Sequence, residues 1–512
     1  MTWINLKSCA AFVAFALTLT VARSQTSAPP STLAQLQERI ANHIGNQKFD
    51  AAVWGVKIVS LDSGKTLFEH NPQKLLSPAS NSKLYTVALA LDRLGVNGRI
   101  KTSLYAKIKP RNDGVLLGDL VVYGRGDPTL NARLNSNDIY RALQPLVAAL
   151  TNAGVRRIEG DLIGDGRFLQ GPPYGSGWAW DDAESYYGAE LSALTINDNT
   201  TQISIKPAER VGAPCALALA PSTDYLVLTN RTTTAEKGTR RAIQFYRPLN
   251  ENVVYVTGQM AMDDNHYTDD LTVHNPAGLF MNLFRQALAG NGVSVRGGVR
   301  TLNWPDTSPQ TVPNHIELAS IESLPMRDLA REVMKPSQNL YTDLLLGYVG
   351  ERTRGPDTPA TVTSEDLGIR ELNRFLDQAG VPRGDVLFEE GSGLSRNNLT
   401  TANATIALLQ FMAKHPCAEA FMEALPVAGV DGTLRNRMRD TPAARNVRAK
   451  TGTLRWANSL SGYVTSAAGE RLIFSIMLNR YHDTDPNRSS RSEVDAIAVK
   501  LAEFTGKSAD NQ

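Results

Sequence analysis

Predicted β-strands at the two ends of the chain place the strongest constraint on its fold. Near the N-terminus, the strand-like residues 53–61 and 66–69 flank a glycine-containing turn, a pattern typical of a β-hairpin. Three more strands are predicted close to the C-terminus, at 447–453, 459–465 and 471–478. If both ends form one antiparallel sheet covered by helices, the long middle of the chain must be inserted into that domain.

The middle of the chain differs in character from its ends. Short strand-like runs dominate there, separated by glycine and proline turns, and the main helical pattern is at 275–289. The predicted fold class is therefore α/β (α+β), with residues 25–103 and 315–512 forming a discontinuous domain whose antiparallel sheet is covered by helices. Residues 104–314 are predicted to be a large, mainly β insertion. Its strand-like runs are at 118–123, 202–206, 225–228 and 253–256.

Helices of the outer domain are predicted from apolar spacing and from their end signals. An amphipathic helix carrying Leu33, Leu36 and Ile40 precedes the first strand, and a helix over 490–504 closes the chain. The remaining predicted helices are at 324–334, 340–348 and 364–380.

The first residues of the chain resemble an export signal. Lys7 supplies a positive region, residues 9–21 form an apolar run rich in small residues, and residues 22–24 resemble a cleavage site. A signal peptide is therefore predicted over residues 1–24, with an uncleaved anchor as the alternative. No later stretch reaches the roughly 20 apolar residues of a membrane span, so the mature chain is predicted to have no integral span.

Charge and residue usage exclude several classes of function. The 512 residues include 53 basic and 51 acidic side chains without a long basic run, so no nucleic-acid partner is expected. The seven histidines and three cysteines show no metal-ligand spacing, and neither a metal nor a cofactor is predicted. Once the signal peptide is removed, Cys215 and Cys417 remain, and the sequence leaves open whether they pair.

A serine and a lysine three residues apart form the first candidate catalytic pair. Ser77 is predicted to cap a helix and Pro78 to occupy its first position, which puts Ser80 in the first turn, where backbone N–H groups are free. Lys83 lies on the same face, in line with Val87 of the buried stripe. Burial could turn this lysine into a base if it lowers the pKa from about 10.4 by roughly three units, or about 4 kcal/mol. Taken alone, the Ser-x-x-Lys pattern is common.

Two further motifs follow along the chain. Ser337 and Asn339 lie in a break between two predicted helices and offer a hydroxyl and an amide, although a helix cap explains them equally well. Residues 395–397 match the same Ser-x-Asn pattern. Lys450, in the run Lys-Thr-Gly-Thr at 450–453, puts a charge and a hydroxyl beside a glycine on a predicted strand, with an exposed edge strand as the alternative.

The order of these three motifs is the one shared by penicillin-binding proteins and serine β-lactamases. The runs at 124–130, 187–189, 425–434 and 460–464, together with the long insertion, narrow the resemblance. The chain resembles the D-alanyl-D-alanine carboxypeptidase/endopeptidases of the low-molecular-mass class C penicillin-binding proteins, the group similar to penicillin-binding protein 4. It departs from them at Glu390, where they usually carry aspartate, and at Arg125, where glycine is common.

This resemblance implies a penicillin-binding transpeptidase-like domain and a catalytic set. Ser80 would be the acylating nucleophile and Lys83 the base, while Ser337 and Asn339 would relay protons and bind the substrate amide. Lys450 would lower the pKa of Lys83 and attract the terminal carboxylate of the substrate. Thr451 and Gly452 would line the opposite wall of the site together with Lys450. The oxyanion hole would consist of the backbone N–H groups of Ser80 and Thr453.

The resemblance also implies the activity and its partners. The expected enzyme is a serine-type D-Ala-D-Ala carboxypeptidase, with a second endopeptidase activity, that acts on peptidoglycan stem peptides in the periplasm and is inhibited by β-lactams. Asp182, Tyr187 and Arg396 resemble positions that contact the amino-carboxyl end of meso-diaminopimelate. The alternatives are a β-lactamase or esterase on the same scaffold and a non-catalytic peptidoglycan-binding protein.

Overall fold

A five-stranded antiparallel sheet joins the two ends of the chain, as the sequence predicts. In this computed structural model, which describes residues 28–306, 314–483, 485 and 489–509, the strand order is β19-β20-β21-β1-β2. The register of β1 against β21 runs from Val53 opposite Asn479 to Ser60 opposite Leu472. The predicted signal peptide at 1–24 lies outside the described residues. The strands are β1 (Val53–Ser60), β2 (Thr66–His70), β19 (Arg448–Leu454), β20 (Ala457–Thr465) and β21 (Arg471–Asn479).

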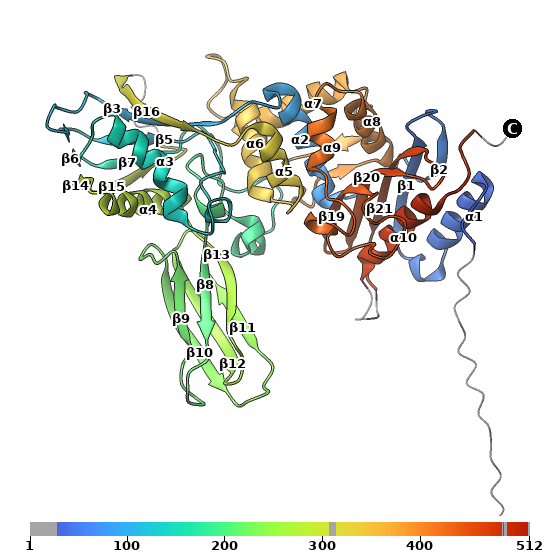
Figure 1. Cartoon of the computed structure of the whole chain (residues 1–512), viewed down its shortest axis with the longest axis horizontal. Helices are drawn as coiled ribbons and strands as arrows, with labels where there is room; N and C mark the ends of the chain where they lie inside the picture. Colours follow the sequence, from blue (N-terminus) through green and yellow to red (C-terminus); the bar gives the residue numbers. More distant parts are fainter. Residues whose placement is uncertain (1–27, 307–313, 484, 486–488, 510–512) are drawn as a thin grey trace, which may run out of the picture.

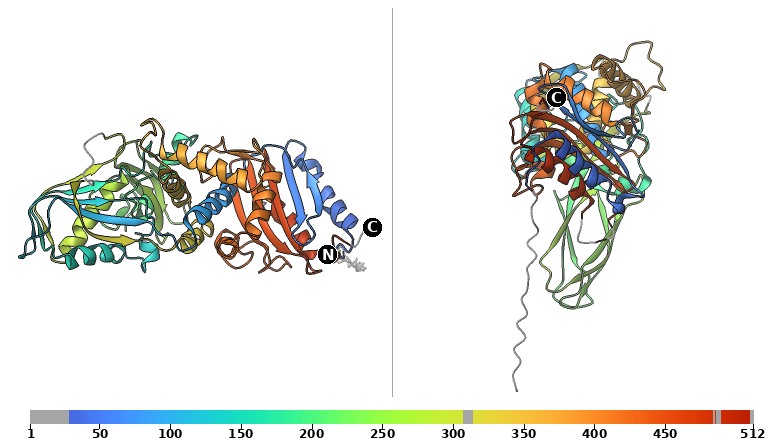
Figure 2. Two further views of the ribbon diagram at one scale, coloured as in Figure 1. Left: turned by 90° about the horizontal axis from the view of Figure 1, so that it is seen from above. Right: turned by 90° about the vertical axis from the view of Figure 1, so that its right-hand side faces the viewer.

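Helices cover both faces of this sheet (Figures 1 and 2). The alternation of side chains sends Val56 and Phe474 into one core, with α1 (Leu33–Ile44) and α10 (Ser490–Glu503), and Ile473 into the other. The second core contains the helices that carry most of the candidate site. They are α2 (Ser82–Leu94), α5 (Met326–Met334), α6 (Asn339–Glu351), α7 (Ser364–Gln378), α8 (Ala402–Ala413) and α9 (Ala418–Ala424).

Helix α2 lies at the centre of this helical layer. The sequence indicates one buried stripe, but every residue from Ser82 to Leu91 is buried, because α5, α6, α7 and α9 all pack around the helix. Its end at Gly95, whose N–H bonds to Leu91 O, agrees with the prediction. The surrounding packing makes α2 a rigid support for residues at its N-terminus.

The first part of the insertion is a second five-stranded sheet packed against two helices, at the left of Figure 1. Helix α4 (Pro276–Gly290) matches the predicted helical pattern, whereas α3 (Ile139–Asn152) was not predicted. A small three-stranded sheet adjoins it. The strands of the larger sheet are β3 (Lys101–Ala106), β5 (Leu120–Tyr123), β7 (Leu162–Asp165), β15 (Val299–Leu302) and β16 (Ile316–Glu322); those of the smaller one are β4 (Val115–Leu116), β6 (Arg157–Ile158) and β14 (Ser294–Val295).

The second part of the insertion is a β-lobe that projects from the body, shown in green in Figures 1 and 2. Two three-stranded sheets pack through side chains such as Ile203, Ile205 and Val256. The strands are β8 (Thr200–Lys206), β9 (Ala216–Ala220), β10 (Val227–Ala235), β11 (Ala242–Tyr246), β12 (Val253–Ala261) and β13 (Tyr267–Thr272).

The pairing of β3 with β16 bears on the limits of the insertion. β3 crosses the predicted limit at 103/104, and β16 lies wholly beyond the predicted limit at 314/315, yet both strands belong to the sheet of the insertion. We propose that the insertion extends from β3 to β16. In the described part of the chain, no helix combines the length and apolar character that a bilayer crossing requires.

Candidate active site

Ser80 lies in a tight turn ahead of α2 and not in the first turn of the α-helix itself. A short 3₁₀ helix spans Ala79–Asn81, and Asn81 is the N-cap of α2. The prediction that Ser77 caps the helix is wrong, because its Oγ has no hydrogen-bond partner among the described residues. The chain turns through Ala79 in the left-handed region, with φ of 48°. Ser459 fixes this turn against the sheet by donating from Oγ to Pro78 O at 2.6 Å.

Lys83 is fully buried beside Ser80. Its Nζ donates to Ser80 Oγ at 3.0 Å, to Asn339 Oδ1 at 2.5 Å and to Ser392 O at 2.7 Å. Burial lowers the pKa of Lys83 to about 8, against the opposing effect of the carboxylates of Glu390 and Asp343. About a tenth of the lysine is then neutral at pH 7, which is enough for it to serve as a base.

Lys450 reaches the site from β19. Its Nζ donates to Ser337 Oγ at 2.7 Å and to Thr451 O at 2.8 Å. Burial, followed by the positive charges of Lys83 and Arg437, holds the pKa of Lys450 well below its usual range. The sequence predicts that Lys450 depresses the pKa of Lys83, whereas burial is the main cause for both lysines.

Ser337 and Asn339 occupy the break before α6, as predicted. Ser337 has φ of 66°, and Asn339 is the first residue of the helix. The Asn339 amide bridges two parts of the site: its Oδ1 accepts from Lys83, and its Nδ2 donates to Tyr187 O at 2.9 Å. The break therefore turns a hydroxyl toward one lysine and an amide toward the other.

The strand β19 forms the opposite wall. Thr451 Oγ1 donates to Thr433 Oγ1 at 2.8 Å, and the Thr453 side chain is exposed. Gly452 lies so close to the Ser80 turn that a Cβ there would be 2.3 Å from Pro78 O. This close approach explains why a glycine is required in the strand.

The three residues predicted to bind diaminopimelate lie around this set. The positive charge of Arg396 acts on Asp182, although burial raises the pKa of that carboxyl overall. Arg396 Nη1 also donates to Arg455 O at 3.1 Å, just beyond β19. Tyr187 meets the site through its carbonyl, which accepts from Asn339, while its ring is 38% exposed.

Sequence reasoning missed the Ser392 carbonyl and its support. The Glu390 carboxylate accepts from Ser392 N at 2.9 Å and from Gly393 N at 2.7 Å, and also from the Ser392 hydroxyl. These bonds fix the loop that turns Ser392 O toward Lys83. In the sequence, Glu390 stands out only because it replaces the aspartate usual at this position in the family that the chain resembles. A backbone carbonyl such as that of Ser392 leaves no mark in a sequence motif.

The two cysteines whose pairing the sequence left open are free thiols. Cys215 is buried in the β-lobe, and Cys417 precedes α9. Among residues 28–306, 314–483, 485 and 489–509, no group of three or more His, Cys, Asp or Glu side chains could hold a metal ion.

Comparison with known proteins covers nearly the whole chain. The D-Ala-D-Ala carboxypeptidase 3 (S13) family matches residues 36–501. The D-alanyl-D-alanine carboxypeptidase of Actinomadura sp. is 34% identical over 493 residues, which cover 93% of this chain and 86% of that protein. D-alanyl-D-alanine carboxypeptidase DacB of Haemophilus influenzae is 27% identical over 429 residues, covering 83% and 85%. The crystal structure of penicillin binding protein 4 (dacB) from Haemophilus influenzae superposes with a TM-score of 0.76 at 25% identity, covering 91% of this chain and 98% of that one.

Proposed function

This chain belongs to the D-Ala-D-Ala carboxypeptidase 3 (S13) family and is a serine-type D-Ala-D-Ala carboxypeptidase, and we propose that it works through an acyl-enzyme on Ser80. The observation that carries the assignment of Ser80 is its hydrogen bond to a buried lysine of lowered pKa. A serine hydroxyl becomes a nucleophile when a neutral base lies within hydrogen-bond reach.

Acylation starts with proton transfer from Ser80 Oγ to the neutral form of Lys83. The oxygen attacks the carbonyl carbon of the terminal D-Ala-D-Ala bond, and the resulting oxyanion takes hydrogen bonds from the backbone N–H groups of Ser80 and Thr453. Asn339 and the Ser392 carbonyl hold the lysine in line with the serine. Preorganised donors of this kind contribute about 10²–10³-fold in rate.

Departure of D-alanine needs a proton on its nitrogen. Ser337 relays this proton: its hydroxyl gives a proton to the nitrogen and takes a replacement from Lys450, whose Nζ donates to Ser337 Oγ at 2.7 Å. Lys450 has no carboxylate within ion-pair distance among the described residues. A substrate carboxylate would provide the missing counter-charge, so we expect a preference for peptides with a free C-terminus. Water then hydrolyses the acyl-enzyme.

The wider function follows from the same acyl-enzyme. We include cleavage of D-alanyl cross-links as a second activity, and inhibition by β-lactams that acylate Ser80. Asp182, Tyr187 and Arg396 are proposed to bind the zwitterionic end of diaminopimelate in the stem peptide, because an acid and a base suit that group. Export through residues 1–24 would deliver the enzyme to its periplasmic substrate.

Mass spectrometry after treatment with benzylpenicillin tests the nucleophile. The wild-type protein should gain one penicilloyl group on the peptide that contains Ser80, and Ser80→Ala should gain none. Covalent labelling of Ser80→Ala would refute the assignment.

Two assays separate the alternatives. Rapid multiple turnover of a chromogenic β-lactam would favour the β-lactamase alternative, whereas stoichiometric labelling favours the carboxypeptidase. Binding to cell wall without release of D-alanine would favour a non-catalytic binding protein.

A further inference from the structure

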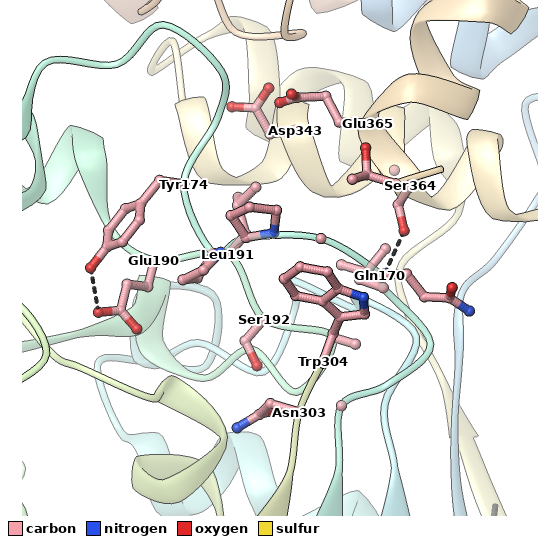
Figure 3. A pocket seen from close by; sticks show the side chains of 18 of the residues that line it. Gln170, Tyr174, Glu190, Leu191, Ser192, Asn303, Trp304, Asp343, Ser364 and Glu365 are labelled. Carbon is pink, nitrogen blue, oxygen red and sulfur yellow. Dashed lines mark hydrogen bonds between the residues drawn. The ribbon is translucent and has the colours of Figure 1, made fainter. Parts of the chain in front are cut away.

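A cavity of about 540 Å³ lies between α6 and α7 of the peptidase domain and the loops of the insertion (Figure 3). None of Ser80, Lys83, Ser337 and Lys450 lines it, so it is distinct from the proposed acylation site. Much of its wall is apolar and comes from Leu169, Pro173, Leu191, Trp304 and Leu346.

Two acidic side chains from neighbouring helices meet at one end of this cavity. Asp343 of α6 and Glu365 of α7 turn their carboxyl groups toward one another (Figure 3). Asp343 is only 5% exposed; its Oδ1 accepts from Gly391 N at 2.8 Å, but its Oδ2 has no hydrogen-bond partner among the described residues. Glu365 accepts from Ser176 Oγ at 2.5 Å. A buried carboxyl oxygen without a partner is costly, and a donor in the cavity would satisfy it.

The charges around this pair are mostly negative. Burial holds the pKa of Asp343 well above its usual range, and the charges of Glu390 and Glu365 add to this effect, whereas Lys83 and the hydrogen bond from Gly391 N oppose it. Burial raises the pKa of Glu365 to about 7, with Glu390 and Asp366 adding to the effect. In the part of the chain that the structure describes, no basic side chain forms an ion pair with either group. Two neighbouring carboxyls without a cation favour a positively charged ligand.

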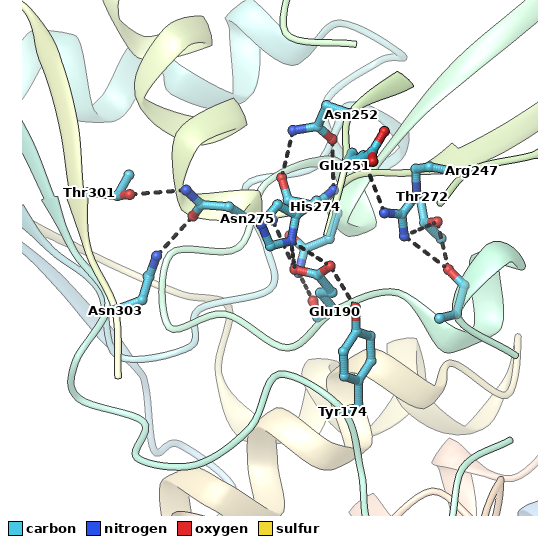
Figure 4. A network of polar contacts seen from close by, with 12 residues as sticks. Tyr174, Glu190, Arg247, Glu251, Asn252, Thr272, His274, Asn275, Thr301 and Asn303 are labelled. Carbon is cyan, nitrogen blue, oxygen red and sulfur yellow. Dashed lines mark hydrogen bonds and ion pairs between the residues drawn. The ribbon is translucent and has the colours of Figure 1, made fainter. Parts of the chain in front are cut away.

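The acid at the other end of the cavity needs no ligand. Glu190 accepts from Tyr174 Oη at 2.9 Å and from Asn275 N at 2.8 Å, and it contacts His274 Nδ1 at 3.0 Å (Figure 4). Its carboxylate is therefore satisfied from within the insertion. This contrast assigns the charged end of a ligand to Asp343 and Glu365.

We propose that this cavity binds an organic ammonium ion whose amine lies between Asp343 and Glu365 and whose carbon chain follows the apolar wall. The cavity is larger than a single metal ion would fill, and its apolar lining offers such an ion no ligands. Ser192 and Asn303 at the wall suit the amide groups of a peptide, so a lysine-like side chain on a peptide matches the chemistry. This proposal does not rest on the proposed acylation of Ser80.

Calorimetric titration with matched small peptides tests this proposal. Nα-acetyl-lysine amide is titrated into the full-length Ser80→Ala protein, which cannot be acylated, and Nα-acetyl-norleucine amide serves as the control that lacks only the ammonium. The lysine compound should bind at least about tenfold more tightly, because a charge-assisted hydrogen bond contributes about 1.5–3 kcal/mol. Binding should release protons and strengthen from pH 6 to pH 8, since Glu365, whose pKa is raised to about 7, must ionise.

Three results would overturn the proposal. They are equal binding of the two compounds, no binding of the lysine compound up to about 10 mM, and displacement of that compound by millimolar Mg²⁺ or K⁺. The last would identify an inorganic cation site instead.

Variants on one helix provide a matched comparison. Glu365→Gln should weaken binding at least about tenfold, whereas Asp377→Asn, which removes an exposed carboxylate from the same helix, should leave it unchanged. Equal loss in both variants, or no loss in Glu365→Gln, contradicts the proposal. Penicillin labelling of Glu365→Gln with Ser80 intact reports on acylation alone. Loss of ligand binding in the cavity can therefore be distinguished from loss of acylation at Ser80.

Discussion

The hydrogen bond between Lys83 Nζ and Asn339 Oδ1 offers a direct test of the base in acylation. Asn339→Asp replaces a neutral acceptor 2.5 Å from the amine by a carboxylate of nearly the same shape. With an effective dielectric constant near 20, two unit charges about 3 Å apart attract by about 5.5 kcal/mol. If burial of the new carboxylate offsets half of this, the protonated lysine gains about 2.7 kcal/mol, which corresponds to about two pH units.

The assay is the acylation rate of a chromogenic β-lactam followed by stopped flow across the pH range. In the wild-type enzyme the rate should rise about tenfold between pH 7 and pH 9, because Lys83, with a pKa of about 8, becomes neutral over that range. In Asn339→Asp the midpoint should move up by about two pH units, and the rate at pH 7 should fall about a hundredfold.

Asn339→Ala is the matched control for this experiment. It removes both side-chain hydrogen bonds without adding a charge, so it should slow acylation without raising the midpoint. A midpoint in Asn339→Asp that coincides with the wild-type value would refute Lys83 as the base whose ionisation controls acylation.

Three further changes probe the walls of the site and the cavity. Gly452→Ala should destabilise the protein by about 3 kcal/mol and abolish penicillin labelling, because the new Cβ would meet Pro78 O at 2.3 Å; thermal melts should show no such loss in Gly118→Ala, where a Cβ meets nothing. Lys450→Ala should reduce the ratio of kcat/KM for a free peptide over its C-terminal amide at least about tenfold, and an unchanged ratio would exclude a contact with the carboxylate. Glu365→Gln should raise the melting temperature at pH 9 but not at pH 4, because the raised pKa of about 7 makes the wild type lose about 3 kcal/mol as pH rises from the unfolded to the folded pKa; equal melting shifts at both pH values would contradict this.

The sequence predicted well that the residues of the proposed catalytic set meet, because each lies in a short motif at a recognisable position on a helix, at a helix break or on a strand. The three motifs that hold Ser80 with Lys83, Ser337 and Lys450 are far apart in the chain, yet their order was enough to predict that they meet. The structure brings them within hydrogen-bond distance in pairs. The pairing of the terminal strands was equally accessible, since alternating apolar residues and turns determine it locally.

Features that depend on packing between distant segments could not be read in this way. The pattern before Ser80 matches a capped helix, but β19 and the loop at Gly393 press against the turn and give Ala79 a left-handed conformation instead. A Cβ at Gly393 would lie only 2.0 Å from Ala79 O, which shows how close that loop approaches. Asp343 was missed for a similar reason, because its significance arises only from its burial beside Lys83.

Helix α6 links the proposed active site to the cavity. It carries Asn339 to Lys83 at its first residue, and one turn later it carries Asp343 to the wall of the cavity. Both Glu390 and Asp343 act on the pKa of Lys83, but the carboxylate of Glu390 is held by hydrogen bonds from its own loop. Asp343 lines the cavity, and its Oδ2 atom has no hydrogen-bond partner in the described chain. The carboxyl most open to a change of charge beside Lys83, the proposed base, is therefore the one that a ligand in the cavity would contact.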